Sequence, residues 1–97
     1  MQDRNLITIT VPVIEKPDCF DWLGRKVIVT PVSVTLYFAP GDPTPVEADV
    51  TGPCRRADPR MLPISGTGTI AYYAIYPSHW PDWLRDLARQ YQPPAQP

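Results

Sequence analysis

Hydrophobic and polar residues alternate along several stretches of the chain, and this two-residue period is typical of β-strands that bury one face. The alternation covers 6–14, 45–54 and 69–76, and the longest apolar run is 27–38. In the first stretch, isoleucine and valine fall on one face and the threonines on the other. Because Pro12 has no N–H to donate to a neighbouring strand, we expect this strand to lie at a sheet edge or to end in a bulge.

The apolar run is interrupted by Pro31, which lacks the backbone donor that a central strand needs. The run is therefore either one strand bulged at Pro31 or two strands, about 26–30 and 32–39. The next residues, 39–44, include two prolines and a glycine and predict a turn that closes a hairpin with 45–54. The stretch at 69–76 is apolar on both faces, so we expect a central strand or a strand with one face on a partner.

The C-terminal segment predicts a helix. Its apolar residues recur at helical spacing, at Trp80, Trp83, Leu84, Leu87 and Tyr91. Its charged residues share the other face as two pairs, Asp82–Arg85 and Asp86–Arg89. We expect Ser78 to cap this helix, Pro81 to lie in its first turn, and Pro93 to end it.

Between the strands and the helix, the segment 52–68 predicts a long loop because it is rich in glycine and proline. The element order is then β-β-β-loop-β-α, which is typical of an α+β fold. We predict a small antiparallel β-meander of four to five strands with one C-terminal α-helix packed on one face. A chain of 97 residues supports one domain, which we place at 1–92, followed by a disordered Pro-rich tail at 93–97.

Charge and composition argue against several classes of protein. The formal net charge of −1 gives no overall attraction to nucleic acid or to anionic membranes. No apolar run is long enough for a membrane helix and no export signal is recognised, so we expect a cytoplasmic protein without membrane contact. In that compartment we expect Cys19 and Cys54 to be reduced thiols, with a single bridge between them as the alternative.

The reactive side chains form no recognised catalytic or metal-binding pattern. His79 is the only histidine, and there is no C-x-x-C or H-x-x-x-H pair with Cys19 or Cys54. Glu47 and Asp49 share a strand face about 7 Å apart, which a solvated strand explains without catalysis. We therefore expect a protein that is not an enzyme, with no catalytic residue, cofactor or metal.

One basic segment is a candidate binding site, because Arg55, Arg56 and Arg60 lie within six residues of one another. With nearby tyrosines as stacking surfaces, these arginines form a candidate interface for single-stranded nucleic acid. The alternatives are an exposed loop that only keeps the protein soluble, and a contact with an acidic surface of another protein.

Aromatic residues exceed what one helix can cover. Strand alternation places Tyr73 on the face opposite to Tyr72 and Tyr76, so some aromatic surface is expected to stay exposed. Exposed aromatic residues beside arginine are typical of binding hot spots. The candidate partner-binding residues are therefore Arg55, Arg56, Arg60, Tyr72, Tyr73 and Tyr76.

The C-terminal motif carries a resemblance to known proteins. After Val50-Thr51-Gly52-Pro53, a basic loop and an aromatic strand lead to Trp80-Pro81-Asp82-Trp83-Leu84-Arg85-Asp86-Leu87. This order resembles small, largely uncharacterised proteins of actinobacteria and actinophages that end in a Pro-x-Trp-Leu-x-x-Leu helix followed by a proline. The resemblance covers residues 32–93 and implies a β-plus-one-helix layout, but it supplies no activity and no site residues.

Together these observations predict a non-enzymatic interaction or accessory protein of phage or mobile-element origin. We expect it to bind a host or phage protein, or to form a homo-oligomer, through its sheet and aromatic surface. The alternative is a small nucleic-acid-binding regulator that uses the Arg55/Arg56/Arg60 loop with aromatic stacking.

Overall fold

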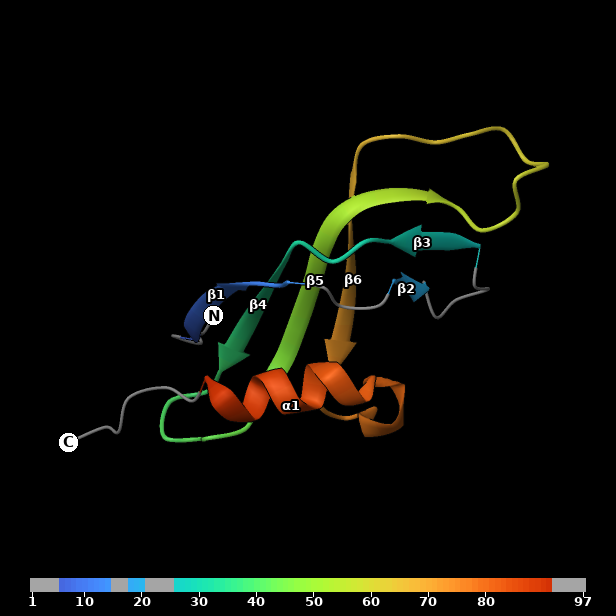
Figure 1. Cartoon of the computed structure of the whole chain (residues 1–97). Helices are drawn as coiled ribbons and strands as arrows, with labels where there is room; N and C mark the ends of the chain where they lie inside the picture. The colour runs from blue at the N-terminus through green and yellow to red at the C-terminus, as the bar shows by residue number, and fades with distance from the viewer. Residues whose placement is uncertain (1–5, 15–17, 21–25, 92–97) are drawn as a thin grey trace, which may run out of the picture.

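A computed structural model describes residues 6–14, 18–20 and 26–91 (Figure 1). Its elements are β1 (Ile7–Pro12), β2 (Cys19–Phe20), β3 (Val27–Val29), β4 (Ser33–Phe38), β5 (Pro45–Arg56), β6 (Thr67–Tyr73), a 3-10 turn (Pro77–His79) and α1 (Asp82–Gln90). An antiparallel sheet with one C-terminal helix confirms the predicted α+β class. The predicted tail at 93–97 lies outside the described residues.

The sheet is antiparallel throughout, but its strand order departs from a simple meander, because β1 lies beside β4 and β3 lies beside β5. β1 pairs with β4 and β2 pairs with β3, while β3 and β4 both pair with β5. β6 pairs with the opposite side of β5 and lies at the edge of the sheet. The expectation of a central position for the strand at 69–76 is therefore wrong, because β5 is the one strand that pairs with β6 among the described residues. The alternative, that one face of this strand meets a partner, stays a prediction.

The kink at Pro31 separates β3 from β4 without ending their pairing with β5. The backbone N–H groups of Thr30 and Val32 donate to the carbonyl oxygens of Pro53 (2.9 Å) and Thr51 (2.8 Å). Three residues between Val29 and Ser33 face two residues of β5 between Cys54 and Thr51, so one extra residue is accommodated at the proline as a bulge. The two predicted alternatives, a bulge at Pro31 and two separate strands, are therefore both partly correct. The structure has two short strands joined by a bulge at Pro31.

The loop between β5 and β6 is shorter than predicted. β5 continues to Arg56 and β6 begins at Thr67, so the connection is 57–66 and the prediction of a loop over 52–68 is wrong. The strand continues through Gly52-Pro53 because β5 passes very close to the kink there. A Cβ atom at Gly52 would lie 1.8 Å from the carbonyl oxygen of Thr30, so only glycine fits at this crossing.

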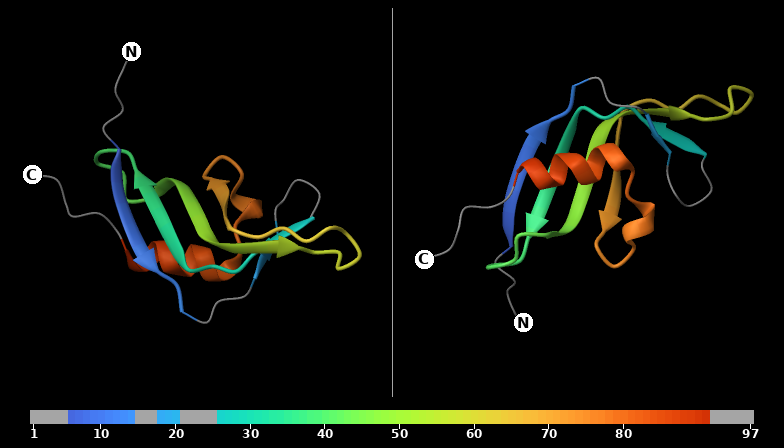
Figure 2. Two further views of the ribbon diagram at one scale, coloured as in Figure 1. Left: turned by 90° about the horizontal axis from the view of Figure 1, so that it is seen from above. Right: turned by 60° about the horizontal axis from the view of Figure 1, so that its bottom comes forward.

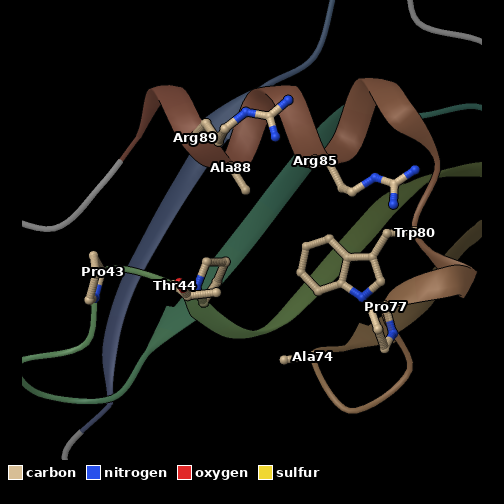
Figure 3. Close-up of a pocket in the computed structure, with 9 residues that line it drawn as sticks. Pro43, Thr44, Ala74, Pro77, Trp80, Arg85, Ala88 and Arg89 are labelled. Atoms are coloured by element: carbon tan, nitrogen blue, oxygen red, sulfur yellow. The ribbon is translucent and has the colours of Figure 1, made fainter.

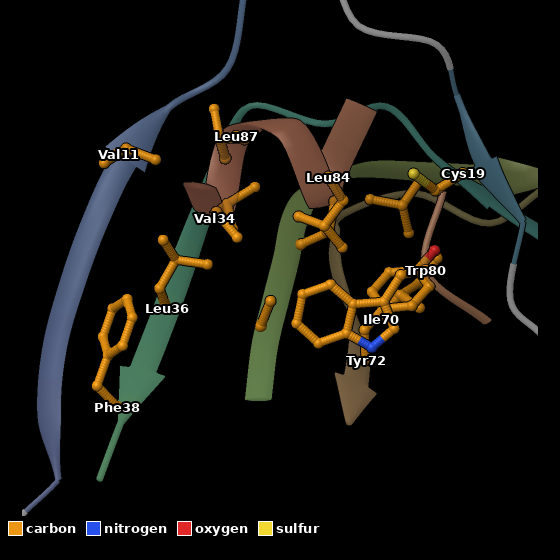
Figure 4. Packing of buried hydrophobic residues seen from close by; sticks show 14 residues of the cluster. Val11, Cys19, Val34, Leu36, Phe38, Ile70, Tyr72, Trp80, Leu84 and Leu87 are labelled. Carbon is orange, nitrogen blue, oxygen red and sulfur yellow. The ribbon is translucent and has the colours of Figure 1, made fainter. Parts of the chain in front are cut away.

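Helix α1 lies across one face of the sheet and covers β1, β4 and β5 (Figure 2). The core between them consists of alternate residues of the strands and of the inner face of α1 (Figure 4). Its fully buried side chains include Val34, Leu36 and Phe38 of β4, Val50 of β5 and Leu84 of α1. The alternation predicted for 45–54 is confirmed at Ala48 and Val50, whereas Glu47, Asp49 and Thr51 face the other side.

The start of α1 differs from the prediction. Pro81 occupies the N-cap position, and Ser78 lies in the preceding 3-10 turn, so the expectation that Ser78 caps this helix is wrong. Both predicted ion pairs are present, with Arg85 Nη2 2.5 Å from Asp82 Oδ1 and Arg89 paired with Asp86. Within the described residues, no helix is both long and apolar enough to cross a membrane.

Candidate functional site

Each of the three arginines predicted to bind a partner makes a hydrogen bond or an ion pair within the chain. Arg55 Nη2 lies 2.6 Å from Asp18 Oδ2, and this hydrogen bond holds the pKa of the Asp18 carboxyl below its usual value. Arg60 Nε lies 3.1 Å from Asp58 Oδ1, and Arg56 Nε donates to the carbonyl oxygen of Leu62 at 3.1 Å. Exposed ion pairs contribute little to stability, but here they cancel most of the local positive charge.

Tyr72, one of the three tyrosines predicted to bind a partner, is buried. Its ring is 5% exposed and lies against Trp80 at a centroid distance of 6.3 Å, and burial raises the pKa of its hydroxyl. Tyr73 and Tyr76 are exposed at the end of β6, together with Ile75, which is 76% exposed. We call Tyr73, Ile75 and Tyr76 the β6-end patch.

The arginines and the exposed tyrosines lie at opposite ends of the β5–β6 ladder. Tyr73 pairs with Glu47, whereas the arginines follow Pro53, which pairs with Thr67. The six steps along the strand from Thr67 to Tyr73 correspond to roughly 20 Å of extended strand. The structure therefore does not bring the predicted stacking surface to the predicted basic segment.

The outer edge of β6 carries backbone groups that β5 does not use. The N–H of Ala74 donates to Val46, and the carbonyl of Gly66 accepts from Cys54, so even-numbered residues of this segment face β5. By strand alternation, the N–H and C=O groups of Thr67, Thr69 and Ala71 point away from β5. Among the residues the structure describes, β6 has no second strand neighbour.

This edge lacks the usual protection against strand pairing. The sequence of β6, Thr-Gly-Thr-Ile-Ala-Tyr-Tyr, contains no charged residue and no proline. Natural sheet edges are commonly blocked by lysine, proline or a bulge. The edge ends at Tyr73, whose carbonyl oxygen accepts hydrogen bonds from the indole Nε1 of Trp80 and the backbone N–H of Tyr76, both at 2.9 Å.

A groove that the sequence did not reveal lies between α1 and the β4–β5 turn (Figure 3). Its volume is about 240 Å³, and its lining residues are Pro43, Thr44, Pro45, Ala74, Pro77, Trp80, Arg85, Ala88 and Arg89. The indole of Trp80 and the prolines make it mainly apolar. Its members come from three separate segments, so no local sequence signal could have identified it.

The sheet face opposite α1 is open and polar, with an acidic pair near its centre. Glu47 lies between Tyr37 and Tyr73 in the strand register, and Asp49 follows on the same face. The Tyr37 hydroxyl donates to Asp49 Oδ2 at 3.2 Å. A hydrogen bond to Asp49, desolvation and the negative charge of Asp49 raise the pKa of Glu47 to about 7.

The raised pKa of Glu47 makes stability depend on pH. Between pH 4.5 and about 7 the folded protein retains a proton that the unfolded chain has released, so the free energy of unfolding falls as pH rises through this window. We expect Glu47→Gln, whose amide donates permanently, to be more stable than the wild type by about 1–2 kcal/mol at pH 8. This figure is reduced from the full linkage value because the pair is partly solvated. Urea denaturation at pH 4.5 and pH 8 measures the difference.

Asp86→Asn is the matched control, because Asp86 lies on the outer face of α1 in an exposed ion pair with Arg89. Its effect on the free energy of unfolding should be small and similar at the two pH values. If the wild type and Glu47→Gln lose the same stability between these pH values, the acidic pair does not share a proton.

Cys19 and Cys54 are not joined by a disulfide, as expected. Cys19 pairs with Val29, which in turn pairs with Cys54, so the cysteines are two strand spacings apart. That separation is about 10 Å, whereas a disulfide needs Cα atoms closer than about 7 Å. Burial raises the pKa of the Cys19 thiol and makes it a poor nucleophile.

The single histidine, His79, lies in the 3-10 turn that follows β6. Its ring stacks on Tyr76 at a centroid distance of 5.2 Å and an interplanar angle of 22°. Within residues 6–14, 18–20 and 26–91, no three His, Cys, Asp or Glu side chains are grouped to hold a metal ion. The expectation that the protein is not an enzyme stays a prediction.

No protein-family model, curated protein or solved structure matches the chain. The resemblance to actinobacterial and phage proteins therefore stays a prediction from the C-terminal motif.

Proposed function

We propose that the chain is a non-enzymatic interaction protein that binds a protein partner by adding a strand at the β6 edge. The observation that carries this proposal is the uncharged outer edge of β6, which ends in the β6-end patch. Strand addition supplies backbone hydrogen bonds for affinity, while neighbouring side chains supply specificity. The Pro-x-Trp-Leu-x-x-Leu motif supports an origin in an actinobacterium, its phage or a mobile element, and we propose the cytoplasm as its location.

The charges around Arg55 and Arg60 favour binding to a protein over binding to a nucleic acid. Arg55 and Arg60 are paired with Asp18 and Asp58, which leaves little net positive charge for phosphate groups. The exposed tyrosines that would stack on bases lie at the other end of the β5–β6 ladder. Two of the three residues of the β6-end patch are tyrosines, and aromatic residues are enriched in protein interfaces.

Affinity capture from the cells that encode the protein tests this proposal. The baits are the wild-type chain, Ala71→Pro on β6 and Thr10→Pro on β1. Ala71→Pro removes an N–H that points away from β5, so the fold should be retained while a partner strand loses a hydrogen bond. We expect at least a tenfold loss of the captured protein with Ala71→Pro, as quantified by mass spectrometry.

Thr10→Pro is the matched control on the opposite sheet edge. Val13 donates its N–H to Val32 of the β3–β4 kink, so the N–H of Thr10 also points out of the sheet. This variant should capture the same partner as the wild type. Equal capture by all three baits, or capture lost only with Thr10→Pro, contradicts the proposal that β6 is the binding edge.

A further inference from the structure

We infer that the partner strand at the β6 edge is the β6 strand of a second copy of the chain, paired antiparallel about a two-fold axis at Ile70. This inference rests on the proposed function, because it names the partner of the same edge. A two-fold interface requires a surface that is complementary to itself. Both the backbone and the side chains of β6 meet this requirement.

The backbone groups are arranged for antiparallel self-pairing. A two-fold axis at Ile70 places Thr69 opposite Ala71 of the partner, and both residues point their N–H and C=O groups outward. The same axis places Thr67 opposite Tyr73, whose N–H is directed outward and whose C=O is held by Trp80 and Tyr76. Because Ile70 is the midpoint of Thr67–Tyr73, this register spans the strand and leaves out one outward group of each copy, the C=O of Tyr73.

In this register the two tyrosines of β6 lie opposite smaller residues of the second copy. On the α1 face, Tyr72 of one copy lies opposite Gly68 of the other, and Ile70 lies opposite its own copy. On the open face, Tyr73 lies opposite Thr67 and Ala71 opposite Thr69. A strand without charges also avoids like charges directly opposite each other, which destabilise antiparallel pairs.

The two-fold axis also brings together apolar residues that are exposed at the two ends of β6. The β6-end patch of one copy comes to the same end of the new ladder as the 57–66 loop of the partner. In that loop Met61 is 52% exposed and Leu62 is 82% exposed. Isolated exposed apolar residues are common. In this pairing, however, the β6-end patch of one copy and Met61 and Leu62 of the other can be buried together.

The symmetric pairing extends the sheet from one copy into the next. Residues that pair across antiparallel strands point to the same face, so both α1 helices lie on one face of the combined sheet and both acidic pairs on the other. The contact is a single strand pair with apolar flanks, so its area falls in the small class of interfaces. We therefore expect a Kd on the order of 10 µM rather than an obligate dimer.

Sedimentation velocity of the full chain, at concentrations on either side of this Kd, tests the inference. We expect the wild type to pass from monomer to dimer and Thr10→Pro to behave in the same way. Ala71→Pro should remain monomeric throughout the series. Circular dichroism and thermal unfolding of each variant establish that it is folded.

Ala71→Lys provides a second variant that does not depend on tolerance for proline. Its side chain lies on the open face opposite Thr69 of the partner, and the two introduced lysines lie diagonally about 7 Å apart. The variant should raise the dimer Kd at least tenfold, and high salt should partly restore dimerisation.

Three results would overturn the inference: a wild type that stays monomeric, a dimer unaffected in folded Ala71→Pro and Ala71→Lys, or a dimer lost in folded Thr10→Pro. A monomeric wild type whose β6 edge still captures another protein overturns the inference alone. A monomeric wild type with no β6-dependent capture overturns the proposed function as well.

Discussion

Gly52→Ala is expected to unfold the protein or to lower its free energy of unfolding by at least about 3 kcal/mol. The added Cβ would lie 1.8 Å from the carbonyl oxygen of Thr30 and 3.1 Å from the backbone nitrogen of Val32. Both atoms belong to the kinked backbone that donates to β5, so neither moves without breaking the pairing that joins β3 and β4 to β5. Urea denaturation followed by circular dichroism measures the loss.

Gly41→Ala controls for the general cost of replacing a glycine in this protein. Gly41 has a φ of +80° in the β4–β5 turn, and its added Cβ would meet no atom within 4 Å. The expected loss is about 1 kcal/mol, from backbone strain alone. If Gly52→Ala is as stable as Gly41→Ala, the close crossing of β5 over the kink is contradicted.

Trp80→Ala is expected to lower the free energy of unfolding by about 3–5 kcal/mol. The Trp80 side chain is 7% exposed and packs against Tyr72, and its indole N–H donates to the carbonyl oxygen of Tyr73 at 2.9 Å. The substitution therefore removes both packing area and the hydrogen bond that connects the segment before α1 to the end of β6. Thermal and urea unfolding of the purified variant measure this loss.

Two further variants separate these contributions. Trp80→Phe retains an aromatic ring and loses the N–H donor, so it should cost about 1–2 kcal/mol. Tyr91→Ala alters an aromatic residue that is 38% exposed at the other end of α1, and it should cost less than about 1 kcal/mol. A Trp80→Ala loss no larger than that of Tyr91→Ala would show that Trp80 does not anchor the helix.

The predicted elements match the structure where the local sequence pattern and the tertiary contacts favour the same conformation. Alternation identified the buried face of β4 and β5, and the i,i+3 spacing identified the ion pairs of α1. The prediction failed at Gly52-Pro53, because local turn preference indicates a loop while pairing with Thr30, distant in the chain, continues the strand. It failed also at Ser78, because the chain makes a 3-10 turn before Pro81 begins the helix.

The candidate site was less accessible to sequence reasoning. Arg55 finds Asp18, 37 residues away, so local charge counting overstated the basic segment. The pairing of Arg60 with Asp58 was visible locally, since the two residues are two positions apart. The free edge of β6 depends on the strand order, and the sequence shows only that the strand is uncharged.

The two thiols differ in a way that provides an internal probe of local opening. Cys19 is 4% exposed and contacts Tyr72 and Trp83, so a thiol reagent reaches it only when α1 lifts from the sheet. Cys54 is half-buried beside Gly66, at the start of β6, where its Sγ lies 3.6 Å from a carbonyl oxygen. Alkylation rates at these two sulfur atoms therefore report separately on detachment of the helix and on fraying of the last strand.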